Sequence, residues 1–169
     1  MQLEILENLD FAIVHITSQN NSINRSAVLL YLLAKQISEN KLTTKIVVAA
    51  GAEVEVESTV MSNVKSIVQW CENKFSDISI DTRFYRFMKP EKEIKSNPDL
   101  LFQHRVSTSE AFFEEALASV DNSAKITIYT EAPVTRNSIS KGGNYISFNA
   151  PFVGMSNDEV LALCPDILL

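Results

Sequence analysis

The chain has 169 residues, an apolar fraction of 46%, and 15 basic against 21 acidic side chains, which gives a formal charge of −6. This length suits a single domain, and the acidic balance disfavours a general affinity for nucleic acid or anionic lipid. Two cysteines are too few for a disulfide framework, and no signal peptide or membrane-length apolar run is present, so we expect a cytoplasmic protein with reduced thiols.

The first half of the chain alternates apolar strands with amphipathic helices. Residues 11–17 and 45–50 are short, β-branched and apolar on both faces, which predicts two strands that are covered on both sides. A helix with apolar positions from Leu29 to Ile37 separates them, and a second begins at Ser58 or Thr59. Residues 53–57 alternate acid and valine, which suggests an edge strand or a short hairpin.

The middle of the chain is more polar. Residues 80–88 alternate and predict a third strand, less buried than the first two. Residues 89–99 are charged and contain two prolines, so we expect a long surface loop. Ser107 and Glu110 then match a capping box at the start of a helix, and residues 125–130 predict a fourth strand.

The last forty or so residues give weaker signals. We expect a polar loop at residues 133–143, a short strand at 145–148, and a second capping box, Ser156 with Glu159, before a brief helix. The apolar end, residues 166–169, resembles one more buried strand. It suggests a docked terminus or a boundary cut from a longer chain.

Strands separated by helices of this length favour a parallel sheet, because each crossover needs about a dozen residues. We therefore predict one α/β domain over residues 1–169, a three-layer, doubly wound, mostly parallel sheet of about five strands, Rossmann-like or flavodoxin-like. In such folds ligands bind at the carboxyl ends of the strands, where the strand order reverses.

The loop after the first strand is the strongest candidate site. It is dense in hydroxyl and amide side chains and leads directly into a helix N-terminus, where free N–H groups attract anions. The residues that we expect to bind phosphate here are Thr17, Ser18, Asn21, Ser22, Arg25 and Ser26. The alternative is that they are ordinary turn and N-cap residues.

Over eight residues this loop resembles the phosphate-binding loop of low-molecular-weight tyrosine phosphatases and arsenate reductases. Arg25 and Ser26 match the Arg-Ser pair that opens the helix in those proteins. Gln19 stands at the position of their nucleophilic cysteine, which excludes their chemistry, because an amide cannot attack phosphorus.

A second loop follows the fourth strand. Thr130 and Glu131 end that strand, and Arg136 and Lys141 follow in the loop. If this loop borders the first, Glu131 can hold a ribose hydroxyl while Thr130 and Arg136 help to bind the ligand.

His15 and Thr17 lie on one face of the first strand, because strand side chains alternate. This His-x-Thr pair resembles half of the site in two-histidine phosphoesterases. The only other histidine is His104, and Val106 replaces the hydroxyl residue of the second pair. A single histidine in an apolar strand is more often a hydrogen-bonded core residue.

Cations and aromatic side chains interleave in the third strand and beyond, as they do in single-stranded nucleic-acid grooves. The cations are Arg83, Arg86, Lys89 and Arg105. An alternating strand with one solvated face gives the same pattern, and the overall acidity favours that interpretation, so we expect no nucleic-acid partner.

The sequence thus favours a small α/β domain, transferase-like or purely ligand-binding, that holds a nucleotide or nucleotide sugar between the two loops. The main alternative is a non-enzymatic assembly or adaptor subunit, a homo-oligomer or a partner of another protein, and a two-histidine hydrolase is the third. No catalytic residue, cofactor or metal-ligand spacing is assigned.

Overall fold

The computed structural model describes residues 1–5, 7–17, 22–118, 120–131 and 138–167, except for the side chains of residues 22 and 23. Within these ranges six strands form one sheet in the order β3-β2-β1-β4-β6-β5. All neighbouring pairs are parallel except β5 with β6. The strands are β1 (Phe11–Thr17), β2 (Lys45–Glu53), β3 (Ile80–Phe87), β4 (Lys125–Tyr129), β5 (Ser138–Lys141) and β6 (Asn144–Asn149).

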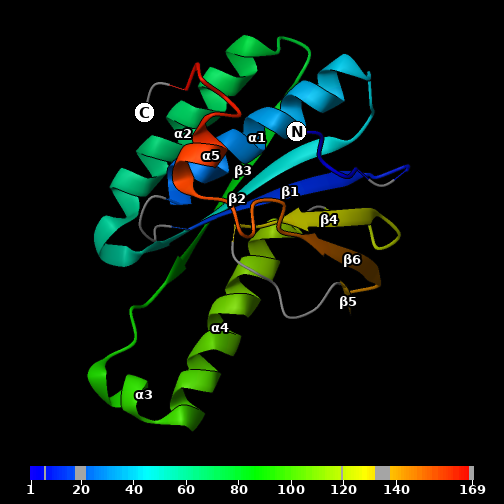
Figure 1. Cartoon of the computed structure of the whole chain (residues 1–169). Helices are drawn as coiled ribbons and strands as arrows, with labels where there is room; N and C mark the ends of the chain where they lie inside the picture. The colour runs from blue at the N-terminus through cyan, green and yellow to red at the C-terminus, as the bar shows by residue number, and fades with distance from the viewer. Residues whose placement is uncertain (6, 18–21, 119, 132–137, 168–169) are drawn as a thin grey trace.

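Helices cover both faces of the sheet (Figure 1). Two buried apolar clusters, one on each face, form the core. One face packs against α1, α2 and α5, and the other packs against α4. The helices are α1 (Ser22–Glu39), η1 (Val54–Val56, a 3-10 turn), α2 (Glu57–Lys74), α3 (Lys92–Ser96), α4 (Pro98–Ala116) and α5 (Asn157–Leu161).

The predicted fold class is confirmed. The chain moves outward from β1 to β2 and β3, then crosses back to place β4 on the other side of β1, so the strand order reverses between β1 and β4. This is how a Rossmann-like sheet begins. The central strands read as apolar on both faces because both faces are covered, and Val14, Ile13 and Val48 are almost wholly inaccessible to solvent.

The region between β3 and β4 differs from the sequence prediction. The expected loop at residues 89–99 contains α3 and the start of α4, and the expected capping box at Ser107 is wrong because that residue lies in mid-helix. The actual N-cap is Asn97, whose side chain accepts hydrogen bonds from the N–H groups of Asp99 and Leu100, and Pro98 occupies the first turn. The N-terminal half of α4 protrudes with α3 beyond the sheet (Figure 1), so it carries no apolar stripe to signal a helix.

Three smaller predictions also changed. Residues 53–57 form the end of β2, a 3-10 turn and the start of α2 rather than a hairpin. Part of the expected polar loop at 133–143 is strand β5. Residues 166 and 167 are not in a strand, and 168–169 lie outside the described residues. The capping box of Ser156 and Glu159 is confirmed, with both of its hydrogen bonds present.

Within the described ranges, no helix combines the length and the apolar character that crossing a bilayer requires.

Candidate functional site

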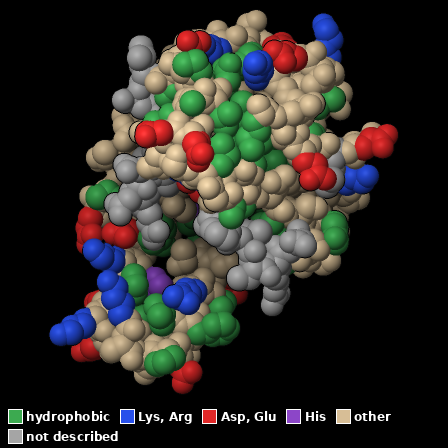
Figure 2. Space-filling model, in the orientation of Figure 1, with side chains coloured by type: hydrophobic (Ala, Val, Ile, Leu, Met, Phe, Trp, Pro, Cys, Tyr) green, Lys and Arg blue, Asp and Glu red, His purple; other side chains and the backbone are tan. Residues whose placement is uncertain are grey.

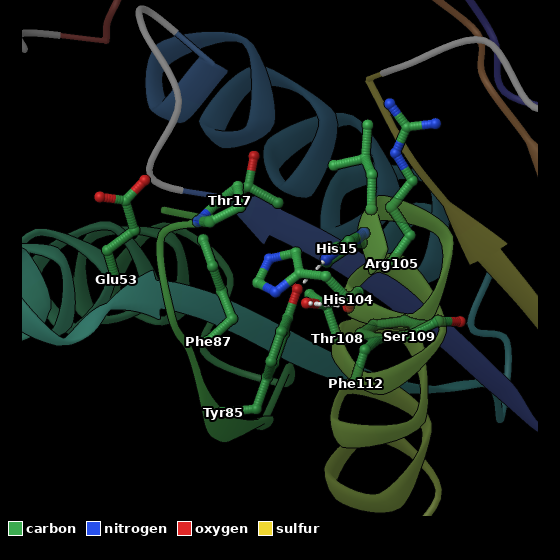
Figure 3. Close-up of a pocket in the computed structure, with 12 residues that line it drawn as sticks. His15, Thr17, Glu53, Tyr85, Phe87, His104, Arg105, Thr108, Ser109 and Phe112 are labelled. Carbon is green, nitrogen blue, oxygen red and sulfur yellow. Dashed lines mark hydrogen bonds between the residues drawn. The ribbon is translucent and has the colours of Figure 1, made fainter. Parts of the chain in front are cut away.

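A cavity of about 460 Å³ opens at the carboxyl ends of β1, β2 and β3, between these strands and α4 (Figure 3). Thr17 on β1, Glu53 on β2 and Phe87 on β3 line its strand side. This is the edge of the sheet where α/β folds bind ligands. The volume lies within the usual range for small-molecule sites, about 300 to 1,000 Å³.

His15 and Tyr85 form the floor of the cavity. His15 Nε2 and the Tyr85 hydroxyl are hydrogen-bonded at 2.5 Å, and the His15 ring lies 4.3 Å from the Phe112 ring, centroid to centroid. Burial lowers the pKa of His15 from 6.5 to about 4 and raises the pKa of Tyr85 above its usual value. Both groups are therefore neutral at pH 7, and the floor offers hydrogen bonding without charge.

A glycine makes this arrangement possible. Gly51 on β2 lies beside Tyr85 on β3 and beside Thr17 on β1 in the strand register. A Cβ atom built on Gly51 would overlap the Tyr85 ring, so the absent side chain leaves the space over which Tyr85 reaches across β2 to His15 on β1. A glycine inside a strand weakens it, and a close approach of this kind is a physical reason for its presence.

One face of α4 forms the opposite wall. Leu101, His104, Arg105 and Thr108 line the cavity at helical spacing, and the Thr108 hydroxyl donates to the His104 carbonyl at 3.0 Å. Arg105 is exposed. Figure 2 shows Lys and Arg side chains gathered around histidine on the part of the molecule that α3 and α4 form. A hollow lies between this part and the rest of the molecule. The cavity thus combines an aromatic floor with a helix wall that carries one cation, Arg105, and a strand side that carries one acid, Glu53.

Arg25 and Glu131 meet at a second place on the same edge, where the strand order reverses. Arg25 Nε donates to both Glu131 carboxylate oxygens, at 3.0 and 3.2 Å, and the two side chains are 14% and 17% exposed. Burial raises the pKa of Glu131, and the neighbouring guanidinium opposes that effect. The Arg25 terminal nitrogens donate to the carbonyls of Phe152 and Met155 and to the Asn157 side chain.

The other residues predicted for the phosphate site divide into two groups. Thr17 lines the cavity, Thr130 is buried at the end of β4, and Ser26 is fully buried, with a hydroxyl that makes no hydrogen bond to any described residue. Ser18, Asn21 and Arg136 lie outside the described residues, and Ser22 begins α1 but its side chain is not described. The structure therefore brings Arg25 and Glu131 together and places only Thr17, among the described members, at the cavity.

Several lining residues were not predicted as ligand contacts from the sequence. From the sequence, His15, His104 and Arg105 belong only to the alternative hypotheses. No local pattern indicates that Glu53 or Phe112 lies beside them. The useful signal is Gly51, an isolated glycine in an apolar strand. Both histidines line one cavity, but His104 lies on a helix and exposed Val106 does not line it, so the second half of a two-histidine site is not formed as a strand pair.

A comparison with models of known protein families and with curated protein sequences gives no match. Among the described residues, no group of three or more His, Cys, Asp or Glu side chains is arranged to hold a metal ion.

Proposed function

We propose that this protein binds a small phosphate-bearing ligand with a planar ring, of the nucleotide or nucleotide-sugar type. The ring occupies the cavity between α4 and the carboxyl ends of β1–β3, and the phosphate extends toward the loop after β1. The observation that carries the proposal is the cavity itself, which joins aromatic side chains, neutral hydrogen-bonding groups and a cation at the ligand-binding edge of the fold.

The aromatic side chains support a ring. Phe87 and Phe112 line the cavity, and the His15–Tyr85 pair lies between them at the floor. Stacking on aromatic rings suits any nucleobase, and a base edge carries neutral donors and acceptors that match a neutral histidine and tyrosine.

The surroundings of the cavity support a phosphate. Thr17 lines the cavity and is also the first residue of the hydroxyl-rich loop that leads into α1. On the other side, Arg105 and His104 bring donors that bind phosphate oxygens. We assign Thr17, Ser18, Asn21, Ser22 and Arg105 to the phosphate and propose no reaction.

Arg25 and Glu131 have a different role in this proposal from the one that the sequence suggested. The donors of Arg25 already bond to four protein groups, so a phosphate would have to displace them. We propose that this pair holds the chain at Glu131, just after β4, against the start of α1 and the segment before α5.

The second candidate is assembly through α4. Phe102 is 68% exposed and Val106 is 40% exposed on the protruding half of this helix, one turn apart. Light scattering tests this directly. A concentration-dependent dimer that Phe102→Ser abolishes supports an assembly role, and a monomer at all concentrations contradicts it.

The test of ligand binding is a thermal-shift screen with nucleotides, nucleotide sugars and inorganic phosphate. A ligand at 100 times its Kd should raise the melting temperature by roughly 5 to 10 °C, because it stabilises only the folded state. Arg105→Ala should reduce affinity on the order of tenfold or more. Lys125→Ala removes one positive charge at the amino end of β4, away from the cavity, and should leave binding unchanged. No shift with any compound at millimolar concentration would contradict the proposal.

A further inference from the structure

A second cavity, of about 390 Å³, adjoins the first along α4. Phe87, His104 and Thr108 line both cavities. The second cavity has its own walls on the side away from His15, and they come from the turn after β2, the end of β3 and the outer part of α4. The two cavities are thus neighbouring compartments of one groove, with shared side chains between them.

The walls of the second cavity are mainly apolar. Val54, Met88 and Ala111 line it, together with Arg86 and Ser107. Met88 is 69% exposed and Val54 is 50% exposed, so two apolar side chains lie in contact with water beside a hollow. A flat ring in this hollow would cover them, and methionine adapts readily to the shape of such a ring.

The boundary between the cavities is polar. His104 faces both compartments, with Arg105 lining the first and Arg86 lining the second. Arg86 Nε donates to Glu57 at 2.8 Å, so this cation already has a carboxylate partner at the start of α2. His104 thus lies where the two cavities meet, with one cation, Arg105, in the first cavity and a second, Arg86, paired with Glu57 in the other.

We infer that the groove takes a dinucleotide-type ligand, in which two rings are joined through phosphate. The first ring occupies the cavity above His15 and Tyr85, the second lies against Met88 and Val54, and the joining phosphate sits beside His104. This inference rests on the proposed function, since the first ring uses the same cavity. It adds the second ring and the linking phosphate to the ligand class.

The test compares each nucleoside 5′-monophosphate, pA, pG, pC and pU, with its 5′-phosphorylated dinucleotide, pApA, pGpG, pCpC and pUpU, by calorimetric titration of the whole chain. The matched dinucleotide should bind roughly fivefold or more tightly, because each stacked base adds about 1 to 3 kcal/mol, which is about 5- to 150-fold.

Two serines on α4 provide matched variants. Ser107 lines only the second cavity and Ser109 only the first, and both are exposed, so tryptophan at either position should not disturb the core. Ser107→Trp should remove the advantage of the dinucleotide and leave the monophosphate affinity within twofold. Ser109→Trp should weaken both ligands. Met88→Ser removes an apolar wall without filling the second cavity and should also reduce the advantage severalfold.

The outcomes separate the two proposals. A monophosphate that binds as tightly as its dinucleotide overturns the two-ring inference and leaves the proposed function standing. A loss of monophosphate affinity in Ser107→Trp as large as that in Ser109→Trp also overturns it. Failure of all eight compounds to bind contradicts both.

Discussion

The carboxyl edge of the sheet has two polar regions that are built in opposite ways. At the β1–β4 corner, each side-chain nitrogen of Arg25 donates to a protein group, and its carboxylate partner is 17% exposed. At the β1–β3 side, His15, Tyr85, His104 and Arg105 line an open cavity. The first region satisfies its polar groups internally and stabilises the fold, whereas the second leaves groups that a ligand can use.

Under the proposed function, the reversal of strand order does not alone identify the ligand site. The reversal lies between β1 and β4, but the described side chains at that point bond to one another. A cavity lined by described residues lies on the other side of β1, where Gly51 lets Tyr85 cross β2 and α4 protrudes to form a wall. Four predictions test the contrast.

The largest expected effect is at the corner. Arg25→Ala leaves a half-buried carboxylate without its cation and three further acceptors without their donor, so the free energy of unfolding should fall by about 3 kcal/mol. The control is Arg83→Ala, because the Asp81 partner of Arg83 is 54% exposed and that pair should contribute less than about 1 kcal/mol. Urea denaturation measures both, and equal losses would show that the corner is not a structural unit.

The second prediction concerns the cavity floor, where the free energy of unfolding should depend on pH through His15. The pKa of His15 is about 4 in the folded chain and 6.5 when unfolded, so the unfolded state binds more protons between these values and stability falls as the pH drops from 6.5 to 4. The loss attributable to His15 approaches about 3 kcal/mol. His15→Gln keeps a hydrogen-bonding partner for Tyr85 but takes up no proton. Urea denaturation at pH 7.5 and at pH 5 should therefore show a smaller loss of stability at the lower pH in His15→Gln than in the wild type. An equal loss in the two proteins would refute the assignment.

A smaller effect is expected at Gly51. Gly51→Ala places a Cβ atom inside the Tyr85 ring, which must move, at a cost of about 2 kcal/mol. Binding of the ring ligand should be lost with it, because the His15–Tyr85 contact breaks. The double variant Gly51→Ala/Tyr85→Leu should be less destabilised than the sum of the two single changes predicts. Full additivity would mean that the two residues do not interact.

The smallest expected loss of stability is again at the β1–β4 corner. Ser156→Ala removes the N-cap of α5 and should cost about 1 kcal/mol. Arg25 bonds to Met155 and Asn157, on either side of this cap. The double variant Ser156→Ala/Arg25→Ala should therefore lose less stability than the sum of the losses in the two single variants. A double-mutant cycle measures the coupling, and a coupling below about 0.3 kcal/mol would show that the cap and the ion pair act independently.

Elements that are buried on both faces or have a clear period could be predicted from the order of residues alone. The strands near residues 11–17 and 45–50, the apolar stripe of α2 and the alternation of helix and strand are local patterns, and they were enough to predict a mostly parallel α/β sheet. The capping box at Ser156 was equally local, since its two hydrogen bonds join residues three apart.

The position of the cavity and the groups that face it depend on contacts between distant parts of the chain. Arg25 and Glu131 are 106 residues apart, and His15 and Tyr85 are 70 apart, so no local pattern could pair them. The sequence does not predict the protruding half of α4, because this half carries no apolar stripe that packs on the sheet. Asn97 and Pro98 were the local signals of its start. Local sequence patterns record which side of an element is buried, but a site depends on which elements meet, and that is set by the packing of the whole chain.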